Sequence, residues 1–272
     1  MGKLQGRRDW FNDEDFWGEY APVMFDDAHW AEVPIVADGV MGLARLDLYG
    51  DGPAASGEKS AAGGQRGPHL LDLCCGFGRL SAEFARRGFA VTGVDITGTY
   101  LRTARGEAAY EKLAVEYVRA DIRDFRRPGF FDLTVNLYIS FGYFDDERDD
   151  RIVLQNVYES LKPGGVFIME TLGKEIAVRD FTEAEWFERA GCTVLTEYEA
   201  VDSWTRLKNR WILLKDGKRR EKIFTQRLYA ASELRSLFLE AGFAKVELYG
   251  DWDESPYDQY AVKLIVVGRK GG

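Results

Sequence analysis

The sequence predicts a doubly wound α/β fold, a mostly parallel sheet with helices on both faces, carrying a small antiparallel β insertion. After Pro68, short apolar strand patterns alternate with helical patterns, which is typical of a parallel sheet that is buried on both sides. Hydrophobic residues make up 46% of the 272 residues and charged residues 30%, the balance of a folded globular chain. These observations exclude a disordered or fibrous protein.

The chain before this alternation has a different character. Phe16, Tyr20 and Val23 recur at helical spacing, and a second apolar stretch with helical periodicity follows them. The next segment is rich in Gly, Ala, Ser and Pro, which predicts a flexible linker. We therefore expect a helical lid at 1–48, a linker at 49–68 and the main domain at 69–272.

Within the main domain, the alternating patterns predict each element in turn. Strands are expected at 69–74, 90–96, 115–120, 133–138, 166–170, 245–249 and 262–267. Helices are expected at 79–87, 100–112, 147–161 and 232–241. The chain should finish as a strand, a loop and a second strand.

The region 193–229 breaks this rhythm. It contains three β-leaning runs, at 193–201, 206–214 and 222–229. Asp216-Gly217, between the last two runs, is a hairpin signal. We expect these runs to form the antiparallel insertion and to act as a lid.

Charge and cysteine content restrict the partners. The net charge of −9 opposes attraction to phosphate backbones and anionic lipid, so nucleic acid is a disfavoured partner and no membrane association is expected. Three cysteines without a CxxC pair speak against a disulfide framework or a metal site. No apolar run approaches the roughly 20 residues of a membrane span, and the first residues lack the core of a signal peptide. We expect a soluble cytoplasmic protein, monomer or homodimer, without a metal.

The most informative stretch is a predicted strand, glycine turn and helix at 70–81, Leu-Leu-Asp-Leu-Cys-Cys-Gly-Phe-Gly-Arg-Leu-Ser. Gly76 and Gly78 let a ligand approach the backbone, and the helix that follows favours an anionic group at its N-terminus. Asp95 ends the second predicted strand, about 17 residues after Gly78, where a carboxylate can accept both ribose hydroxyls of an adenosine. The combination predicts an adenosine cofactor.

Asp72 indicates which adenosine cofactor it is. A carboxylate immediately before the turn repels the pyrophosphate of NAD or FAD and attracts an ammonium group. Ser81 also occupies the place of the third glycine of a dinucleotide fingerprint. S-adenosylmethionine, with its ammonium, carboxylate and ribose, matches all of these features. Asp121, at the end of the third strand, can accept a hydrogen bond from the adenine amino group, and Ile122 can cover the ring.

These motifs resemble those of the class I S-adenosylmethionine-dependent methyltransferases. Leu-Asp-Leu-Cys-Cys-Gly-Phe-Gly, Val-Thr-Gly-Val-Asp-Ile, Ala-Asp-Ile-Arg-Asp-Phe and Leu-Lys-Pro-Gly-Gly-Val-Phe are similar to successive signatures of that family. The resemblance implies a Rossmann-like sheet of seven strands in the order 3-2-1-4-5-7-6, with strand seven antiparallel, and S-adenosyl-L-methionine as the cofactor. Cys74 departs from the family's usual glycine, and a positive φ there would strain the turn.

The closer likeness is to small-molecule methyltransferases that have an N-terminal helical lid, a β-rich insertion after strand five and a late loop, here 249–258. The residues expected to bind the cofactor are Tyr20, Asp72, Cys74, Gly76, Gly78, Asp95, Ile96, Asp121, Ile122 and Asn136. The residues expected to contact the acceptor are Tyr138, Phe141, Tyr143, Trp204, Asp253 and Tyr257.

No acid-base pair can be named from the sequence. Tyr20, His29, Tyr138 and Tyr143 are weak candidates for catalysis, and ordinary packing is the alternative for each. Positioning alone can lower a barrier by about 7 to 11 kcal/mol, so a neutral amine needs no base, whereas a hydroxyl acceptor does. We expect methyl transfer to nitrogen or oxygen of a small molecule. An RNA or protein methyltransferase, an NAD-dependent oxidoreductase and a non-catalytic adenosylmethionine-binding protein remain as alternatives.

Overall fold

The computed structural model describes residues 9–46 and 67–272. Apart from Gly67 and Pro68, the expected linker at 49–68 lies outside these residues. No helix among them has the length and apolar character needed to cross a membrane.

The helices are η1 (Trp10–Asn12), α1 (Glu14–Met24), α2 (Asp27–Ala31), α3 (Val33–Ala44), α4 (Arg79–Arg86), α5 (Gly98–Tyr110), α6 (Glu147–Ser160), α7 (Lys174–Arg179) and α8 (Ala231–Glu240). The strands are β1 (His69–Leu73), β2 (Ala90–Asp95), β3 (Val115–Arg119), β4 (Phe131–Asn136), β5 (Leu161–Thr171), β6 (Ala184–Arg189), β7 (Cys192–Val201), β8 (Arg206–Lys215), β9 (Lys218–Arg227), β10 (Lys245–Tyr249) and β11 (Leu264–Arg269).

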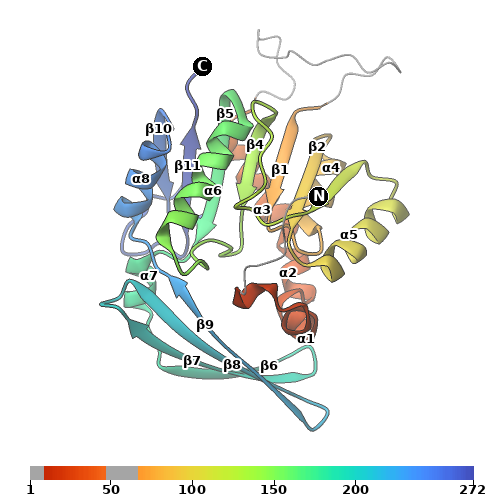
Figure 1. Cartoon of the computed structure of the whole chain (residues 1–272), viewed down its shortest axis with the longest axis vertical. Coiled ribbons are helices and arrows are strands. Elements are labelled where there is room, and N and C mark those ends of the chain that lie inside the picture. Colours follow the sequence, from red (N-terminus) through yellow and green to blue (C-terminus); the bar gives the residue numbers. More distant parts are fainter. Residues whose placement is uncertain (1–8, 47–66) are drawn as a thin grey trace.

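A seven-stranded sheet forms the centre of the molecule (Figure 1). Its strand order is β10-β11-β5-β4-β1-β2-β3. The strands from β5 to β3 pair in parallel, whereas β11 is antiparallel to both β5 and β10. The predicted doubly wound α/β fold is therefore confirmed, together with the strand order and the antiparallel strand that the resemblance implied.

Alternate residues of the strands point to opposite faces of this sheet, and helices bury both faces. Leu71 of β1 packs in the core cluster that contains residues of α6 and α8. Its neighbour Leu70 packs in the cluster of the other face, which contains residues of α3 and α4. Helix α3 thus covers the sheet, with Val40 fully buried against it. A lid function for the first 48 residues stays a prediction that concerns η1, α1 and α2.

A second, antiparallel sheet of order β6-β7-β8-β9 lies across the carboxyl-terminal edge of the first (Figure 1). The hairpin between β8 and β9 turns at Asp216 and Gly217, both with positive φ (48° and 70°), as the sequence predicted. The insertion is larger than the expected 193–229, because β6 was not predicted. Strand β6 is mostly exposed and shows no burial alternation, and it joins β7 through Ala190 and Gly191 without a strong turn dipeptide.

Strand β4 ends earlier than predicted. The apolar run suggested a strand to Tyr138, but the last paired residue is Asn136. Tyr138 and Ile139 both have positive φ (56° and 58°), which an extended strand does not allow. The backbone N–H of Tyr138 instead donates to the carboxylate of Glu170 at 2.6 Å. The chain therefore turns sharply at the carboxyl edge, where the site lies.

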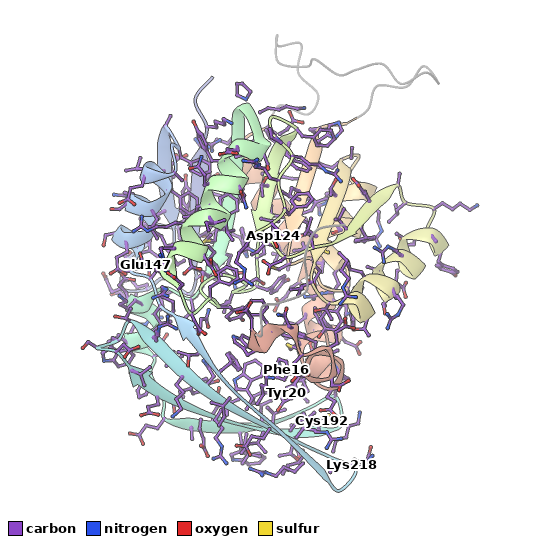
Figure 2. The ribbon with its side chains drawn as sticks, in the orientation of Figure 1. Phe16, Tyr20, Asp124, Glu147, Cys192 and Lys218 are labelled. Carbon is purple, nitrogen blue, oxygen red and sulfur yellow. The ribbon has the colours of Figure 1, made fainter. Side chains whose placement is uncertain are left out.

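Helix α1 fills the space between the carboxyl edge and the insertion. Asp13 caps its first turn by accepting a hydrogen bond from the N–H of Phe16 at 3.0 Å. Phe16 and Tyr20 pack in one cluster with Val194 and Cys192 of the second sheet. Figure 2 shows Phe16 and Tyr20 directed toward the strand that carries Cys192. The apolar face of α1 is thus buried mainly against the insertion.

The end of β9 is attached to the loop that follows β4. The N–H of Arg227 donates to the carbonyl of Gly142 at 2.7 Å. The Arg227 guanidinium and the Tyr229 hydroxyl both donate to Asp150 Oδ2 on α6, at 3.1 and 2.8 Å. Gly142 has a φ of +89°, and a Cβ there would lie 2.5 Å from the carbonyl oxygen of Arg227. The close approach of the two chain segments therefore requires glycine.

We expect Gly142→Ala to lower the free energy of unfolding by about 3 kcal/mol or more, because positive φ and a backbone clash both oppose it. Gly129→Ala is the matched control. Gly129 also has positive φ (+62°), but no atom lies within 4 Å of the position that a Cβ would take, so the strain alone should cost about 1 kcal/mol. Urea unfolding measures both. Equal losses in the two variants would contradict the close packing at Gly142.

Candidate functional site

The turn between β1 and α4 is the centre of the candidate site. Gly76 and Gly78 have φ values of +56° and +72°, and a Cβ on Gly78 would overlap the hydroxyl of Tyr117. Cys74 also has a positive φ of 59°. The substitution of the family's glycine by Cys74 therefore places a side chain in a left-handed conformation, the strain that the sequence led us to expect.

Asp95, at the end of β2, ties this turn to the next one. It is 7% exposed, and its Oδ2 accepts the N–H of Gly76 at 2.9 Å while its Oδ1 accepts the N–H of Thr97 at 2.7 Å. Burial raises the pKa of Asp95, and the two backbone hydrogen bonds oppose that rise. Each carboxylate oxygen has a second acceptor position. Asp95 can therefore still accept the hydroxyls of a ribose.

Asp72 is the second buried carboxyl group at the turn. It is 3% exposed, and its Oδ2 accepts a hydrogen bond from the Ser81 hydroxyl at 2.6 Å. Burial raises its pKa to about 7, and the nearby charge of Asp95 adds to the rise, whereas the Ser81 hydrogen bond opposes it. A cation bound beside Asp72 would favour the charged carboxylate and remove this cost.

The third expected carboxylate, Asp121, lies in a buried ionic cluster. Arg123 donates to both of its oxygens, with Nη2 at 2.6 Å from Oδ2 and Nε at 3.0 Å from Oδ1. Arg123 also pairs with Asp149 at 2.8 Å and with Asp9. The cluster connects the residue before η1 to the end of β3. Contact between Asp121 and adenine stays a prediction.

Two apolar residues were expected to line the cofactor site beside these carboxylates. Ile96 and Ile122 are both partly buried and pack against the core cluster that contains Leu71. Their contact with the cofactor stays a prediction.

The carboxyl end of β4 carries polar atoms without a partner. Asn136 Nδ2 donates to the Leu73 carbonyl at 3.2 Å. Within the described residues, Asn136 Oδ1 and the Tyr138 hydroxyl are buried and have no hydrogen-bond partner. Because buried polar atoms are normally bonded, these atoms favour a ligand at this edge of the sheet.

The residues expected at the acceptor lie in several groups. Tyr143 contacts Trp10 edge to face, with ring centroids 5.0 Å apart, and Trp10 stacks on Phe224 of β9 at 4.2 Å. Phe141 is buried beside Tyr229, at 5.7 Å between rings. We call Trp10, Tyr143, Trp211 and Phe224 the aromatic wall. It is formed by η1, the loop after β4, and strands β8 and β9.

Trp204 and Tyr257 lie around α7 instead. Trp204 packs edge to face on Phe181, just after α7, with centroids 5.1 Å apart. The Tyr257 hydroxyl donates to Glu175 at 3.0 Å. Asp253 is exposed and accepts the N–H of Ser255 within its own loop at 3.0 Å. The structure therefore does not gather the six expected acceptor residues into one group.

Tyr20 and His29 are engaged elsewhere. The Tyr20 hydroxyl donates to the Trp211 carbonyl at 3.0 Å, and burial raises its pKa to about 12. His29 Nδ1 lies 2.5 Å from Asp26 Oδ1, within the first turn of α2. Its carbonyl accepts a hydrogen bond from Arg79. These contacts are those of ordinary packing, which the sequence left open as the alternative to a catalytic role for both residues.

Two residues of the site were missed. Trp10 precedes any recognisable helix, and no sequence pattern connects it with Tyr143 or Phe224. Arg79 follows the glycine turn directly and is buried. Its position in the motif was a usable signal, because a cation at the first residue of that helix must lie close to the cofactor edge.

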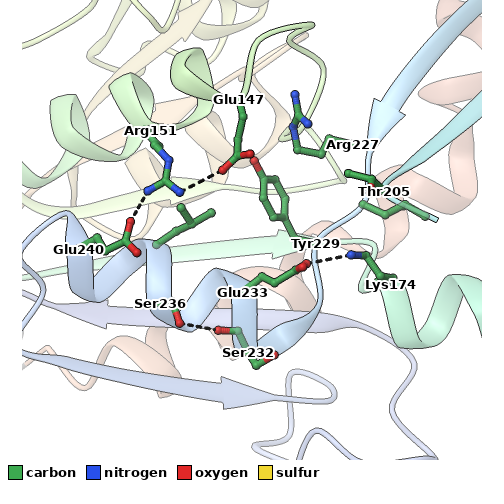
Figure 3. A pocket seen from close by; sticks show the side chains of 12 residues that line it. Glu147, Arg151, Lys174, Thr205, Arg227, Tyr229, Ser232, Glu233, Ser236 and Glu240 are labelled. Atoms are coloured by element: carbon green, nitrogen blue, oxygen red, sulfur yellow. Dashed lines mark hydrogen bonds and ion pairs between the residues drawn. The ribbon is translucent and has the colours of Figure 1, made fainter. Parts of the chain in front are cut away.

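A separate hollow of about 330 Å³ opens between α6, α8 and the end of β9 (Figure 3). None of the residues that line it belongs to the glycine turn. Its charged side chains pair with one another, as Arg151 does with Glu147 at 3.0 Å and Lys174 with Glu233 at 3.0 Å. We therefore place the candidate site at the turn and not in this hollow.

Comparisons with known proteins agree with this location. Residues 70–165 match a protein family described as a methyltransferase domain. A methyltransferase of Geobacillus sp. (strain WCH70) is 23% identical over 217 residues, which cover 76% of this chain and 87% of that protein.

Solved structures share the fold over nearly the whole chain. The CcbJ methyltransferase from Streptomyces caelestis has a TM-score of 0.72 at 19% identity, with 96% of this chain and 100% of that chain covered. An amino pentose methyltransferase from Micromonospora echinaspora, solved with S-adenosylmethionine bound, has a TM-score of 0.63 at 20% identity, with 99% and 100% covered. The match therefore includes the insertion as well as the central sheet.

Asp72 should make the stability of the ligand-free protein depend on pH. Its pKa is 3.8 in the unfolded chain and about 7 in the folded protein, so the folded state binds more protons in this window and loses stability as pH rises through it. Asp72→Asn removes this loss. We expect the variant to gain up to about 4 kcal/mol relative to wild type between about pH 4 and about pH 8. Urea unfolding at both pH values checks this, and a constant difference would contradict it.

The strain at Cys74 predicts opposite effects for two substitutions. Cys74→Gly relieves the left-handed conformation and should leave the protein equally stable or about 0.5 to 1 kcal/mol more stable. Cys74→Val places a β-branched side chain at the same φ and should cost about 1 kcal/mol or more. Thermal unfolding of the ligand-free variants compares them. A less stable Gly variant would show that contacts of the thiol outweigh the strain.

Proposed function

We propose that this chain is a class I S-adenosylmethionine-dependent methyltransferase that methylates nitrogen or oxygen of a small molecule. The methyltransferase domain matched at residues 70–165 and the fold shared with solved methyltransferases support this proposal. The observation that carries the proposal is the pair of buried carboxyl groups, Asp72 and Asp95, on either side of the glycine turn. A ribose and an ammonium group, both present in S-adenosylmethionine, are the partners that these two positions require.

The residues of the turn fit this cofactor. Asp95 would accept the ribose hydroxyls, Asp72 would face the ammonium, and Asn136 Oδ1 offers a further buried acceptor. The first turn of α4 presents backbone N–H groups to an anionic group. S-adenosylmethionine supplies an electrophilic methyl group on a sulfonium. The protein has to orient both reactants and exclude water.

The aromatic wall and α1 form the cover that excludes water. Trp10, Tyr143 and Phe224 pack ring against ring between the carboxyl edge and the insertion. A cover of this kind obstructs a nucleic-acid duplex or a folded protein, which favours a compact acceptor. The acidic net charge of −9 also opposes binding to a phosphate backbone. The amino pentose methyltransferase with the same fold supports a small acceptor.

An amine is the acceptor that needs least help from the protein. Burial raises the pKa of Tyr143 above its ordinary value of 10, so its hydroxyl is a poor base near neutral pH. The His29 ring is bound to Asp26. A neutral amine carries its own lone pair and requires only alignment with the methyl group. We therefore propose nitrogen as the preferred acceptor atom.

Two measurements test the proposal, one of cofactor binding and one of methyl transfer. Calorimetry should show binding of S-adenosylmethionine and no comparable binding of NAD. A panel of small amines and alcohols is then screened for formation of S-adenosylhomocysteine. Tight binding of NAD without S-adenosylmethionine would refute the cofactor, and binding without turnover on any acceptor would refute the enzymatic proposal.

Asp95→Asn should weaken S-adenosylmethionine binding by roughly 10- to 100-fold, because the ribose hydroxyls lose a charged acceptor. Asparagine keeps one oxygen for a backbone N–H but places its amide nitrogen against the second N–H, so the alignment of the two turns also weakens while the fold should persist. Asp216→Asn, in the exposed hairpin turn between β8 and β9, is the matched control and should bind like wild type. Unchanged affinity in folded Asp95→Asn would show that Asp95 does not bind the ribose.

A further inference from the structure

Glu170 is a buried carboxyl group at the carboxyl end of β5, and the proposed function so far gives it no role. It is 7% exposed. Its Oε2 accepts the backbone N–H of Tyr138 at 2.6 Å, whereas its Oε1 lies 3.9 Å from Nζ of Lys263, beyond hydrogen-bond distance. Within the described residues Oε1 accepts no hydrogen bond, which leaves it available to a ligand.

The register of three strands places Glu170 on the same face of the sheet as Asp72. Asp72 of β1 pairs with Val135 of β4, and Val135 pairs with Ile168 of β5. Glu170 follows Ile168 by two residues, so its side chain points to the same face but lies nearer to the carboxyl edge. Neighbouring strands are about 4.8 Å apart, so Glu170 lies roughly 10 Å along the sheet from Asp72, on the side away from β2.

This position is the side from which an acceptor can approach. The cofactor of the proposed function lies over the ends of β1 and β2, between Asp72 and Asp95. The next strand ends, those of β4 and β5, are therefore left for the acceptor. The end of β4 carries a buried oxygen, Asn136 Oδ1, that has no hydrogen-bond partner among the described residues. Acceptor oxygens on both strands thus face a ligand with N–H or O–H donors.

The charges around Glu170 favour a cation. Burial raises the pKa of Glu170, and the charges of Glu32 at the end of α2 and Asp251 after β10 add to the rise, whereas Lys263 opposes it. Lys263 is one cation beside three carboxyl groups, and it makes only a long contact with Glu170. A positive charge next to Oε1 would favour the ionised carboxylate.

We propose that Glu170 binds the nitrogen of an amine acceptor and compensates the positive charge that this nitrogen gains on methylation. The lone pair of the nitrogen forms the bond to the methyl carbon, and the bond between that carbon and sulfur breaks with its electron pair passing to the sulfur. The positive charge moves from sulfur to nitrogen, whose protons stay in place. A carboxylate beside the nitrogen becomes more stabilising as this charge develops. The inference rests on the proposed function, since it names a residue for its acceptor.

Two cofactor analogues test the role without a known acceptor. Sinefungin carries an amine-bearing carbon where S-adenosylhomocysteine has sulfur, so its ammonium lies where the transferred methyl group would be. Calorimetry should show that the wild-type protein prefers sinefungin. Glu170→Gln should reduce this preference by roughly 10- to 100-fold, because a hydrogen bond between charged groups is lost, and should change the affinity for S-adenosylhomocysteine by less than about threefold. Glu240→Gln, at the exposed end of α8 beside Arg151, is the matched control and should change neither affinity.

Lys263→Gln separates this role from a structural one. If Glu170 served only to pair with Lys263, removal of either partner would have the same effect. We expect the opposite: without Lys263 the charge of Glu170 is less compensated, so the preference for sinefungin should stay the same or rise. Glu170→Asp keeps the charge but withdraws it by one methylene, and it should also reduce the preference if the glutamine variant does not fold.

Three results would overturn the role of Glu170 and leave the methyltransferase proposal intact. They are a wild-type protein that binds both analogues equally, an unchanged preference in folded Glu170 variants, and a lower preference in Lys263→Gln. A wild-type protein that binds neither analogue would overturn the proposed function instead.

Discussion

The carboxylate of Asp95 is the contact on which the site depends. One of its oxygens accepts the N–H of Gly76 and the other accepts the N–H of Thr97, so a single side chain joins the turn after β1 to the turn after β2. Parallel strands bring their carboxyl ends to one edge but do not align the loops that follow. This pair of hydrogen bonds aligns them. It also keeps a carboxylate in a buried place, where its remaining acceptor positions are available to a ligand.

Around this contact the structure concentrates buried charge and aromatic surface. Asp72 and Arg79 lie on either side of the same turn and, among the described residues, form no ion pair with each other, whereas Arg123 gathers the carboxylates of Asp9, Asp121 and Asp149 into a closed cluster. The closed cluster resembles the ionic networks that support a fold. The open arrangement at Asp72 and Arg79 is more typical of a binding site, because within the described residues each group has a neutral hydrogen-bond partner but no ion pair.

Two sets of contacts join the insertion to the rest of the molecule. Gly142 and Asp150 hold the end of β9, and α1 lies between the insertion and the carboxyl edge, with Tyr20 bonded to the Trp211 carbonyl. The aromatic wall is therefore assembled from segments that are far apart in the chain. The wall includes only part of the set of residues that the sequence predicted at the acceptor. Tyr143 belongs to the wall, whereas Trp204 and Tyr257 pack around α7.

Local patterns in the sequence were sufficient for the α/β alternation, the glycine turn, Asp72 and Asp95, because each depends on residues that are near one another in the chain. The hairpin at Asp216 was predictable for the same reason, and β6 was missed because an exposed strand has no burial period to reveal it. Only the tertiary structure shows that the Tyr20 hydroxyl donates a hydrogen bond to the insertion and that Arg123 forms an ion pair with Asp121. The burial of Arg79 among the rings of Phe25, Trp30 and Tyr138 is likewise a tertiary contact. These contacts join segments with no common sequence period, so packing in three dimensions alone determines them.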